Sequence, residues 1–254
     1  MPQRLHLSIQ IENTTGSAYL AQLGKLYGPE RVLLYDNQKQ RFIRLSSSPL
    51  TIGQSVLKTG RNLLEKAPLV GKIIPGTPDE GLAGENGYAL EELPEDTAAV
   101  HGHFTPELFD GEVENSFLTI VLRDPLERMI KQYQEWKRRE GRVNWRINHP
   151  YEPDISFRDF AFLKKYRNYQ SKYLGNERLG DFDVVGVLEY LEIHLCQLRN
   201  EDWSHIKIRT RKPGSGRFLK DKKLGLTVDL IEEFKDYHMK DYAIYNQAKA
   251  FMGY

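Results

Sequence analysis

The chain has 254 residues, of which 40% are hydrophobic and 28% charged, and its formal net charge is +1. This is the composition of an ordinary globular protein. The net charge argues against a general nucleic-acid or membrane-surface binder, which would have a strong excess of basic residues. The lone cysteine, Cys196, excludes an internal disulfide and a cysteine zinc cluster. It favours a reducing, cytoplasmic compartment, and we expect neither a secretory signal nor a transmembrane segment.

The N-terminal residues predict a strand, a helix and a second strand. Apolar and polar side chains alternate over residues 5–11, residues 18–27 have helical spacing, and residues 31–36 form another apolar run. The turn between the first strand and the helix, residues 12–17, reads ENTTGS. A turn of this kind offers backbone amides and hydroxyl groups to a phosphate, although an ordinary βα turn has the same composition.

Residues 46–96 depart from this pattern through recurrent glycine and proline. We expect a helix over residues 52–64 within this excursion. The apolar, lysine-containing stretch 52–74 could touch a membrane surface, but a surface excursion packed on the domain is the preferred interpretation. We assign this part of the chain no chemistry.

A strand over residues 97–100 leads into His101 and His103, which are two residues apart and therefore point to one face of a strand. At a strand end in a cleft, one imidazole could serve as a general base near neutral pH. Two hydrogen-bonded structural histidines would give the same pattern. A metal site needs a third ligand, and the nearby sequence supplies no obvious one.

The most informative stretch is residues 117–133, which read FLTIVLRDPLERMIKQY. Its apolar beginning predicts a buried strand of a parallel sheet, and Pro125 marks the first turn of the helix that follows. Arg123 stands between the two. An arginine at the carboxyl end of a buried strand, beside a helix N-terminus, is placed where open α/β sheets bind anions.

The C-terminal half predicts a short helix capped by Ser156, a helix over 166–174, strands over 183–188 and 205–210, and a long helix over 227–252. A basic, glycine-containing loop follows the second of these strands and could close over a phosphate. Its candidate ligands are Lys212, Gly214, Ser215 and Arg217.

This alternation of strands and helices predicts an α/β protein with a central parallel sheet. Neither an internal repeat nor a clear linker interrupts the pattern. We therefore expect a single domain over residues 1–254, with the excursion at about 46–96.

Taken in order, these segments resemble the sulfotransferases that use PAPS (3′-phosphoadenosine 5′-phosphosulfate), in particular the carbohydrate branch and related bacterial proteins. The strongest match is residues 122–133, LRDPLERMIKQY, which resemble the family segment that binds the 3′-phosphate. Arg123 matches the phosphate-binding arginine of that segment. The position eight residues on, usually a serine, is Lys131, which can also neutralise a phosphate.

The turn after the first strand resembles the family loop that binds the 5′-phosphosulfate group. Thr14, Gly16 and Ser17 fit that loop, and the resemblance gives Thr15 the same role. Asn13 stands where the family has a lysine that contacts the bridging oxygen and stabilises the leaving group.

Four further matches follow in the family's order, and their joint order is more specific than any one of them. They are GHF at 102–104, which resembles the segment with the catalytic histidine, YRNYQ at 166–170, FDVVGVLE at 182–189, and DYAIY at 241–245.

The resemblance implies a P-loop-kinase-like fold with three layers, α/β/α, and transfer of a sulfuryl group from PAPS to a hydroxyl or amine. The acceptor would be a carbohydrate or a small molecule. His103 would be the general base, with His101 as the fallback, and the loop 212–217 would close over the nucleotide. Cationic side chains and amides would supply the positive charge, so no metal would be needed.

Asn13 leaves a second hypothesis open, because loss of a cation aimed at the leaving oxygen costs about 3 kcal/mol, or roughly a hundred- to thousandfold in rate. Either another cation substitutes, such as Lys25 or one from 46–96, or the chain is a weak or inactive nucleotide- or glycan-binding protein on a sulfotransferase scaffold. A kinase that uses ATP is disfavoured because the sequence lacks GxxxxGK[ST].

Overall fold

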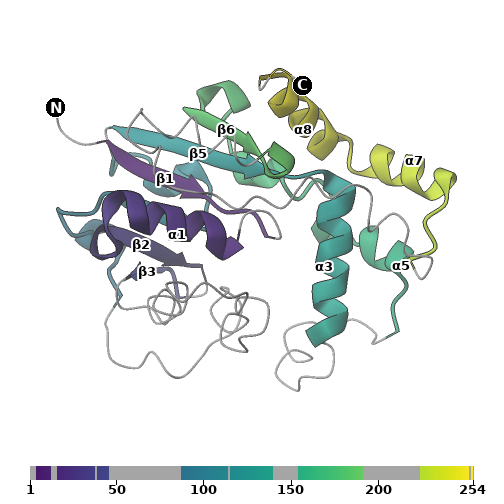
Figure 1. Ribbon diagram of the computed structural model, residues 1–254, viewed down its shortest axis with the longest axis horizontal. Coiled ribbons are helices and arrows are strands. Elements are labelled where there is room, and N and C mark those ends of the chain that lie inside the picture. The colour runs from purple at the N-terminus through teal and green to yellow at the C-terminus, as the bar shows by residue number, and fades with distance from the viewer. Residues whose placement is uncertain are drawn as a thin grey trace. The chain divides into compact units, whose positions relative to one another are not determined.

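The computed structural model describes residues 4–12, 16–37, 39–45, 87–113, 115–139, 154–190, 224–251 and 253 (Figure 1). The chain divides into two compact units. Unit 1 comprises Met1–Gln10 and Thr15–Ile120, and unit 2 comprises Ile11–Thr14 and Val121–Tyr254. The expectation of a single domain stays a prediction.

Six strands form one mostly parallel sheet in the order β3-β2-β4-β1-β5-β6. They are β1 (Leu5–Ile9), β2 (Val32–Asp36), β3 (Arg41–Arg44), β4 (Ala99–Gly102), β5 (Ser116–Leu122) and β6 (Val184–Val187). β1 pairs in parallel with β4 and β5, and β2 with β4, whereas β3 runs antiparallel to β2. The sheet confirms the predicted α/β class. Sequence reasoning missed β3, a short strand with an arginine at each end.

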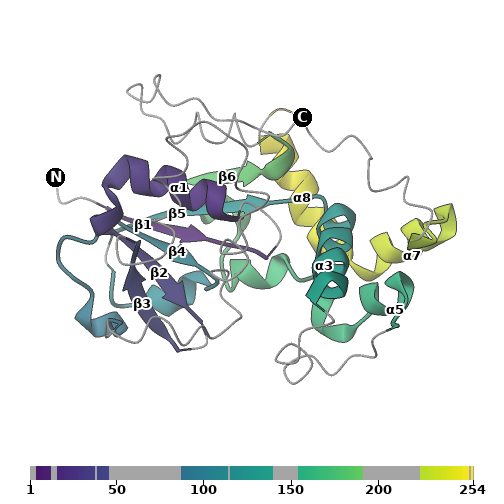
Figure 2. The same cartoon turned by 60° about the horizontal axis from the view of Figure 1, so that its bottom comes forward.

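The predicted strand-helix-strand unit at the N-terminus is confirmed in unit 1. β1 leads into α1 (Gly16–Tyr27), which lies along one face of the sheet and returns the chain to β2 (Figures 1 and 2). Tyr19 and Leu23 of α1 are buried. β4 packs so closely on β2 that a Cβ at Gly102 would lie 2.7 Å from the Cβ of Tyr35. Glycine is therefore required at the end of β4.

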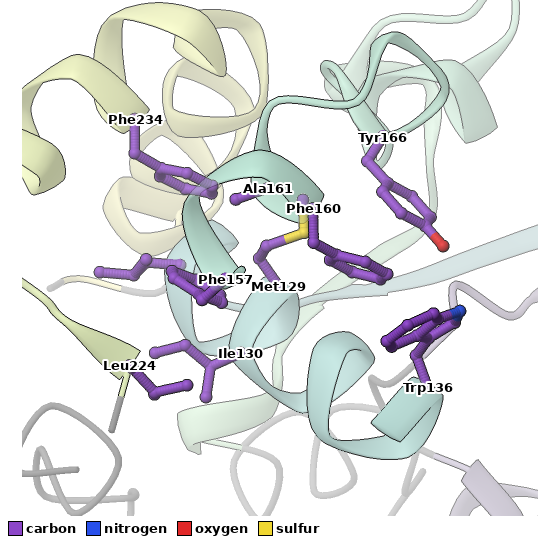
Figure 3. Packing of buried hydrophobic residues seen from close by; sticks show 10 residues of the cluster. Met129, Ile130, Trp136, Phe157, Phe160, Ala161, Tyr166, Leu224 and Phe234 are labelled. Atoms are coloured by element: carbon purple, nitrogen blue, oxygen red, sulfur yellow. The ribbon is translucent and has the colours of Figure 1, made fainter. Parts of the chain in front are cut away.

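Unit 2 contains helices packed around a hydrophobic cluster. The helices are α3 (Pro125–Arg139), α5 (Phe157–Ala161), α7 (Val228–Tyr237) and α8 (Met239–Phe251). α3 contributes Met129 and Ile130 to the cluster, α5 contributes Phe160, and α7 contributes Phe234 (Figure 3). All four side chains are buried. The hydroxyl of Ser156 caps α5, as predicted.

The predicted helix over 166–174 is wrong. The structure has two 3-10 turns in this region, η7 (Lys164–Tyr166) and η8 (Ser171–Leu174). Between them Asn168 has a φ of 50°, in the left-handed region, which an α-helix does not accommodate. The cause is tertiary: the Asn168 amide donates to the ring of His238, and the Asn168 side-chain oxygen accepts from the amide of Lys240.

His238 also interrupts the predicted C-terminal helix over 227–252. α7 ends before His238 and α8 begins after it. Nδ1 of the ring accepts from the Asn168 amide at 3.3 Å, so Nε2 carries the proton and donates to the carbonyl of Ala161 at 3.1 Å. The imidazole is thus hydrogen-bonded on both sides at the bend between the two helices.

β5 and α3 confirm the strand and helix predicted on either side of Arg123, and β6 confirms the strand predicted over 183–188. The predicted strand over 205–210, the helix over 52–64 and the membrane-contacting stretch 52–74 lie outside the described residues. Within the described ranges, no helix is long and apolar enough to cross a membrane.

Candidate functional site

In unit 1 the order of the strands indicates a ligand site at the carboxyl ends of β1 and β4. The two strands are adjacent and parallel, with Ile9 opposite Gly102. From β1 the chain passes to β2, whereas from β4 it passes to β5, on the other side of β1. The connections that leave these two parallel strands therefore lead to opposite sides of the sheet. Open α/β sheets bind ligands at the carboxyl ends of the strands at such a point. His103 follows β4 at this edge.

His103 is held in one orientation by the residue that follows β1. Its Nδ1 lies 2.8 Å from the backbone oxygen of Gln10. A carbonyl oxygen can only accept a hydrogen bond, so Nδ1 carries the proton and Nε2 carries the lone pair in the neutral ring. In this tautomer Nε2 is the nitrogen that can accept a proton. The assignment of His103 as the base stays a prediction.

His101 is less suited to the same task. It is 2% exposed, compared with 7% for His103, and its Nδ1 lies 2.9 Å from the hydroxyl of Ser8. Burial, together with the neighbouring His103 and His6, lowers the pKa of His101 to about 3. A base with so low a pKa takes up a proton weakly near neutral pH. Of the two predicted candidates, His103 therefore fits the role better.

A chain of hydrogen-bonded polar side chains joins α1 to β1 and β5, and sequence reasoning missed it. The hydroxyl of Tyr27 lies 3.0 Å from Nδ1 of His6, and Nε2 of His6 lies 2.9 Å from Thr119 Oγ1. Thr119 in turn lies 3.2 Å from the hydroxyl of Tyr19. The signal was present in the alternation of β1, where His6 and Ser8 share one face. Burial raises the pKa of Tyr27 to about 12, so this hydroxyl stays protonated.

In unit 2, Arg123 stands one residue beyond β5, as predicted, but its neighbours are acidic. Its Nη2 lies 3.4 Å from Oε2 of Glu127, and the two side chains are 11% and 14% exposed. Asp124 and Glu189 are close enough for Arg123 to influence their titration. Burial raises the pKa of all three carboxyl groups, and Arg123 acts in the opposite direction on each. An incoming phosphate would therefore meet an arginine that already has an anionic partner.

The main chain at Arg123 is held by two side chains from distant segments. The carboxamide of Gln170 accepts from the Arg123 amide at 2.9 Å and donates to the Arg123 carbonyl at 2.8 Å. The carboxylate of Glu189 accepts from the next amide, that of Asp124, at 3.1 Å. Gln170 and Glu189 belong to two of the four segments that resemble the sulfotransferases. The structure therefore gives these segments a shared physical role.

Another of those four segments, residues 241–245, holds the backbone of Gln170 in place. Both carboxylate oxygens of the buried Asp241 accept backbone amides, from Gln170 at 3.1 Å and from Ser171 at 2.8 Å. Burial raises the pKa of Asp241, whereas these hydrogen bonds and the nearby positive charge of Arg128 lower it. Asp241 thus fixes the backbone that carries the Gln170 side chain.

Lys131 is turned toward the far end of α3. Its Nζ lies 3.0 Å from Oε1 of Glu135, one turn further along the helix. Glu135 also pairs with Arg138, at 2.6 Å. The described contacts of Lys131 are therefore with the next turn of α3 rather than with Arg123, and its role at a 3′-phosphate stays a prediction.

A buried arginine that the sequence did not indicate lies on the same helix. Arg128 is 1% exposed, and its guanidinium lies 4.6 Å from the centre of the Tyr169 ring. Nη1 of the guanidinium lies 3.5 Å from Oε1 of Gln132. The side-chain Nε2 of Gln132 donates at 3.0 Å to Oε2 of Glu12. Gln132 thus links a buried cation to a carboxylate that immediately precedes the predicted phosphosulfate loop.

The remaining predicted ligands are only partly covered by the structure. Gly16 and Ser17 form the first turn of α1, where backbone amides of a helix N-terminus favour an anion. Lys25, considered as a substitute for the missing loop lysine, lies in the last turn of α1, roughly 14 Å along the axis from Gly16. The other candidates fall outside the described residues; they are Asn13, Thr14, Thr15, Lys212, Gly214, Ser215 and Arg217.

The described side chains contain no group of three or more histidine, cysteine, aspartate or glutamate residues arranged to hold a metal ion. Comparison with known proteins finds no family model that matches the chain and no curated protein that matches it.

Proposed function

We propose that the protein is a sulfotransferase that moves a sulfuryl group from PAPS to a hydroxyl or amine of a carbohydrate or small-molecule acceptor. The observation that supports this most is the convergence on Arg123. Gln170 binds its main chain, Glu189 binds the next amide, that of Asp124, and Asp241 binds the amide of Gln170. The segments that carry these residues resemble the family in sequence. They are far apart along the chain, yet their side chains meet at this one place.

The fold is compatible with the proposal. The sheet is mostly parallel, and the connections from β1 and β4 lead to opposite sides of it. Sheets of this kind bind nucleotides at the carboxyl ends of their strands. We further propose that the fold is the three-layer, P-loop-kinase-like architecture, with helices on both faces of the sheet.

In the proposed reaction the acceptor oxygen or nitrogen forms a bond to sulfur as the bond from sulfur to the 5′-phosphate oxygen breaks. The acceptor proton passes to Nε2 of His103, and adenosine 3′,5′-bisphosphate leaves. Like phosphoryl transfer, the step depends on alignment and on stabilisation of charge. Within this scheme the turn at 14–17 binds the 5′-phosphosulfate through amides and hydroxyls. Arg123, Lys131 and the loop 212–217 bind the rest of the nucleotide.

The acidic surroundings of Arg123 set a condition on this scheme. A 3′-phosphate must displace Glu127 from the guanidinium or bind alongside it, and like charges at close range oppose binding unless a proton is taken up. The same surroundings, together with Asn13, favour a second candidate: a nucleotide- or glycan-binding protein on the same scaffold that transfers sulfate slowly or not at all.

Calorimetry with adenosine 3′,5′-bisphosphate tests whether the protein binds the proposed nucleotide. The wild type should bind, and Arg123→Ala should weaken binding by at least about tenfold, or 1.4 kcal/mol. The matched control is Arg158→Ala, which removes an exposed arginine of the same unit that pairs with Glu233. A wild type that binds no bisphosphate overturns the proposal.

Transfer from labelled PAPS to a panel of glycans and small alcohols separates the two candidates. Turnover that falls by about a hundredfold in His103→Ala supports the sulfotransferase and its base. Tight bisphosphate binding without transfer to any acceptor would favour the binding protein.

A further inference from the structure

The side-chain carboxamide of Gln170 makes two backbone hydrogen bonds to Arg123 of the kind that a neighbouring strand would make. In a hydrogen-bonded pair of an antiparallel sheet, a residue exchanges one N–H···O and one C=O···H–N bond with a single partner residue. Arg123 exchanges this pair of bonds with a side chain. Its amide donates to Gln170 Oε1 at 2.9 Å, and its carbonyl accepts from Gln170 Nε2 at 2.8 Å. Gln170 is fully buried. It thereby satisfies both backbone groups of Arg123, one residue beyond the end of β5.

Gln170 can hold Arg123 only because its own backbone is fixed. Asp241 accepts consecutive amides from Gln170 and Ser171 at 3.1 and 2.8 Å. Asp241 belongs to α8 and is itself buried. A buried carboxylate is stable only when its charge is compensated, and the two amides and the neighbouring Arg128 provide that compensation.

The residue after Arg123 is fixed as well. The Asp124 amide donates to Glu189 at 3.1 Å, and the Asp124 carboxylate accepts from the amide of Glu127 at 2.9 Å, in the first turn of α3. The backbone on both sides of the Arg123 side chain therefore has its hydrogen bonds made within the described residues. A side chain that projects from a fixed backbone loses less conformational freedom when it binds an anion.

We propose that Gln170 and Asp241 are positioning residues that fix the main chain of Arg123 and so allow its guanidinium to select nucleotides with a 3′-phosphate. This inference rests on the proposed function, because it takes the anion to be the 3′-phosphate. A purely structural role would make Gln170 important for stability but would leave the selectivity between nucleotides unchanged. Selectivity is therefore the property to measure.

The test compares the affinities for adenosine 3′,5′-bisphosphate and adenosine 5′-monophosphate, which differ only in the 3′-phosphate. The wild type should prefer the bisphosphate by at least about tenfold. In Gln170→Met, which retains the length of the side chain but removes both hydrogen bonds, the preference should fall by about tenfold while the monophosphate binds as before. Gln134→Met, a change of the same kind at a half-buried position on α3, should retain the full preference.

A second variant covers the case in which Gln170→Met does not fold. Gln170→Glu retains the acceptor for the Arg123 amide and loses the donor to the Arg123 carbonyl, but a protonated carboxyl group regains a donor. Relative to the wild type, its preference for the bisphosphate should therefore recover as the pH falls. A stabilising role alone predicts no such recovery.

The outcomes separate the inference from the function on which it rests. If the wild type binds neither nucleotide, both are overturned. If the wild type prefers the bisphosphate and Gln170→Met or Gln170→Glu shows the same preference at every pH, the function stands and the positioning role is overturned. Equal loss of both affinities in Gln170→Met would also overturn the positioning role.

Discussion

The guanidinium of Arg123 lies 3.4 Å from the carboxylate of Glu127, one helical turn away, and both side chains are largely buried. A partly buried ion pair of this kind stabilises the first turn of α3, but it also occupies the group that is proposed to receive a phosphate. The ion pair that favours folding thus competes with the proposed ligand for the same guanidinium group.

Glu127→Gln should strengthen the binding of adenosine 3′,5′-bisphosphate by about three- to tenfold, because it removes a negative charge beside Arg123. In the wild type, affinity should rise as the pH falls through the pKa of Glu127, which burial raises. The variant should lack this part of the pH dependence. Calorimetry at several pH values measures both, with Glu232→Gln, at an exposed position in α7, as the control. Weaker binding by Glu127→Gln would contradict the prediction.

His101 should make the folded state less stable in acid. Its pKa is about 3 in the folded protein, compared with 6.5 for an ordinary histidine. Between these values the unfolded chain binds the additional proton, so the free energy of unfolding falls as the pH falls, by up to about 1.4 kcal/mol per pH unit. Urea denaturation of the wild type and His101→Asn between pH 7 and pH 4 measures this contribution. Identical slopes for the two proteins would show that His101 is not buried in its neutral form.

Arg128 and Asp241 should be energetically coupled although they form no direct ion pair. Each compensates part of the other's charge in the interior of unit 2. Arg128→Met and Asp241→Asn should each lower the free energy of unfolding, and the double variant should lose at least about 0.5 kcal/mol less than the sum of the two. Denaturant unfolding of the four proteins gives the coupling. Additive losses would mean that the two charges do not interact.

Gly102→Ala should destabilise the protein by about 1–3 kcal/mol, because the new methyl group has no room between β4 and β2. The added Cβ would lie 2.7 Å from the Tyr35 Cβ and 3.0 Å from the Tyr35 carbonyl oxygen. Gly180→Ala is the matched control, since a Cβ there would meet no atom within 4 Å. Thermal unfolding of the two variants measures the difference. Equal melting temperatures would show that the strands can move apart at no cost.

The strands and the first helices could be predicted from the sequence because burial imposes a local pattern. Residues 117–122 are almost continuously apolar, and Pro125 marks where α3 begins. β3 escaped this reasoning because four residues with an arginine at each end show little periodicity. Its partner strand, β2, supplies the context that its own sequence lacks.

The errors near the C-terminus have a different origin. Asn168 and His238 are 70 residues apart, and the hydrogen bond between them both prevents a helix over 166–174 and contributes to the bend between α7 and α8. Local propensity contains no information about such a contact. The position of Arg123 could be predicted for the opposite reason, since the order strand, arginine, proline, helix lies within one continuous stretch, residues 117–133. Its partner Glu127, four residues further on, was also within reach, because side chains at this spacing meet on a helix.

The hydrogen bonds around Arg123 have a consequence for how such a protein can evolve. Gln170 and Glu189 bind the main chain at positions 123 and 124, and every residue type except proline offers the same amide there. Replacement of the arginine would therefore leave these main-chain hydrogen bonds in place, while the proposed anion ligand would be changed or lost. A lineage could abandon one anion, or acquire another, through substitutions at a single position without first rebuilding the fold that presents it.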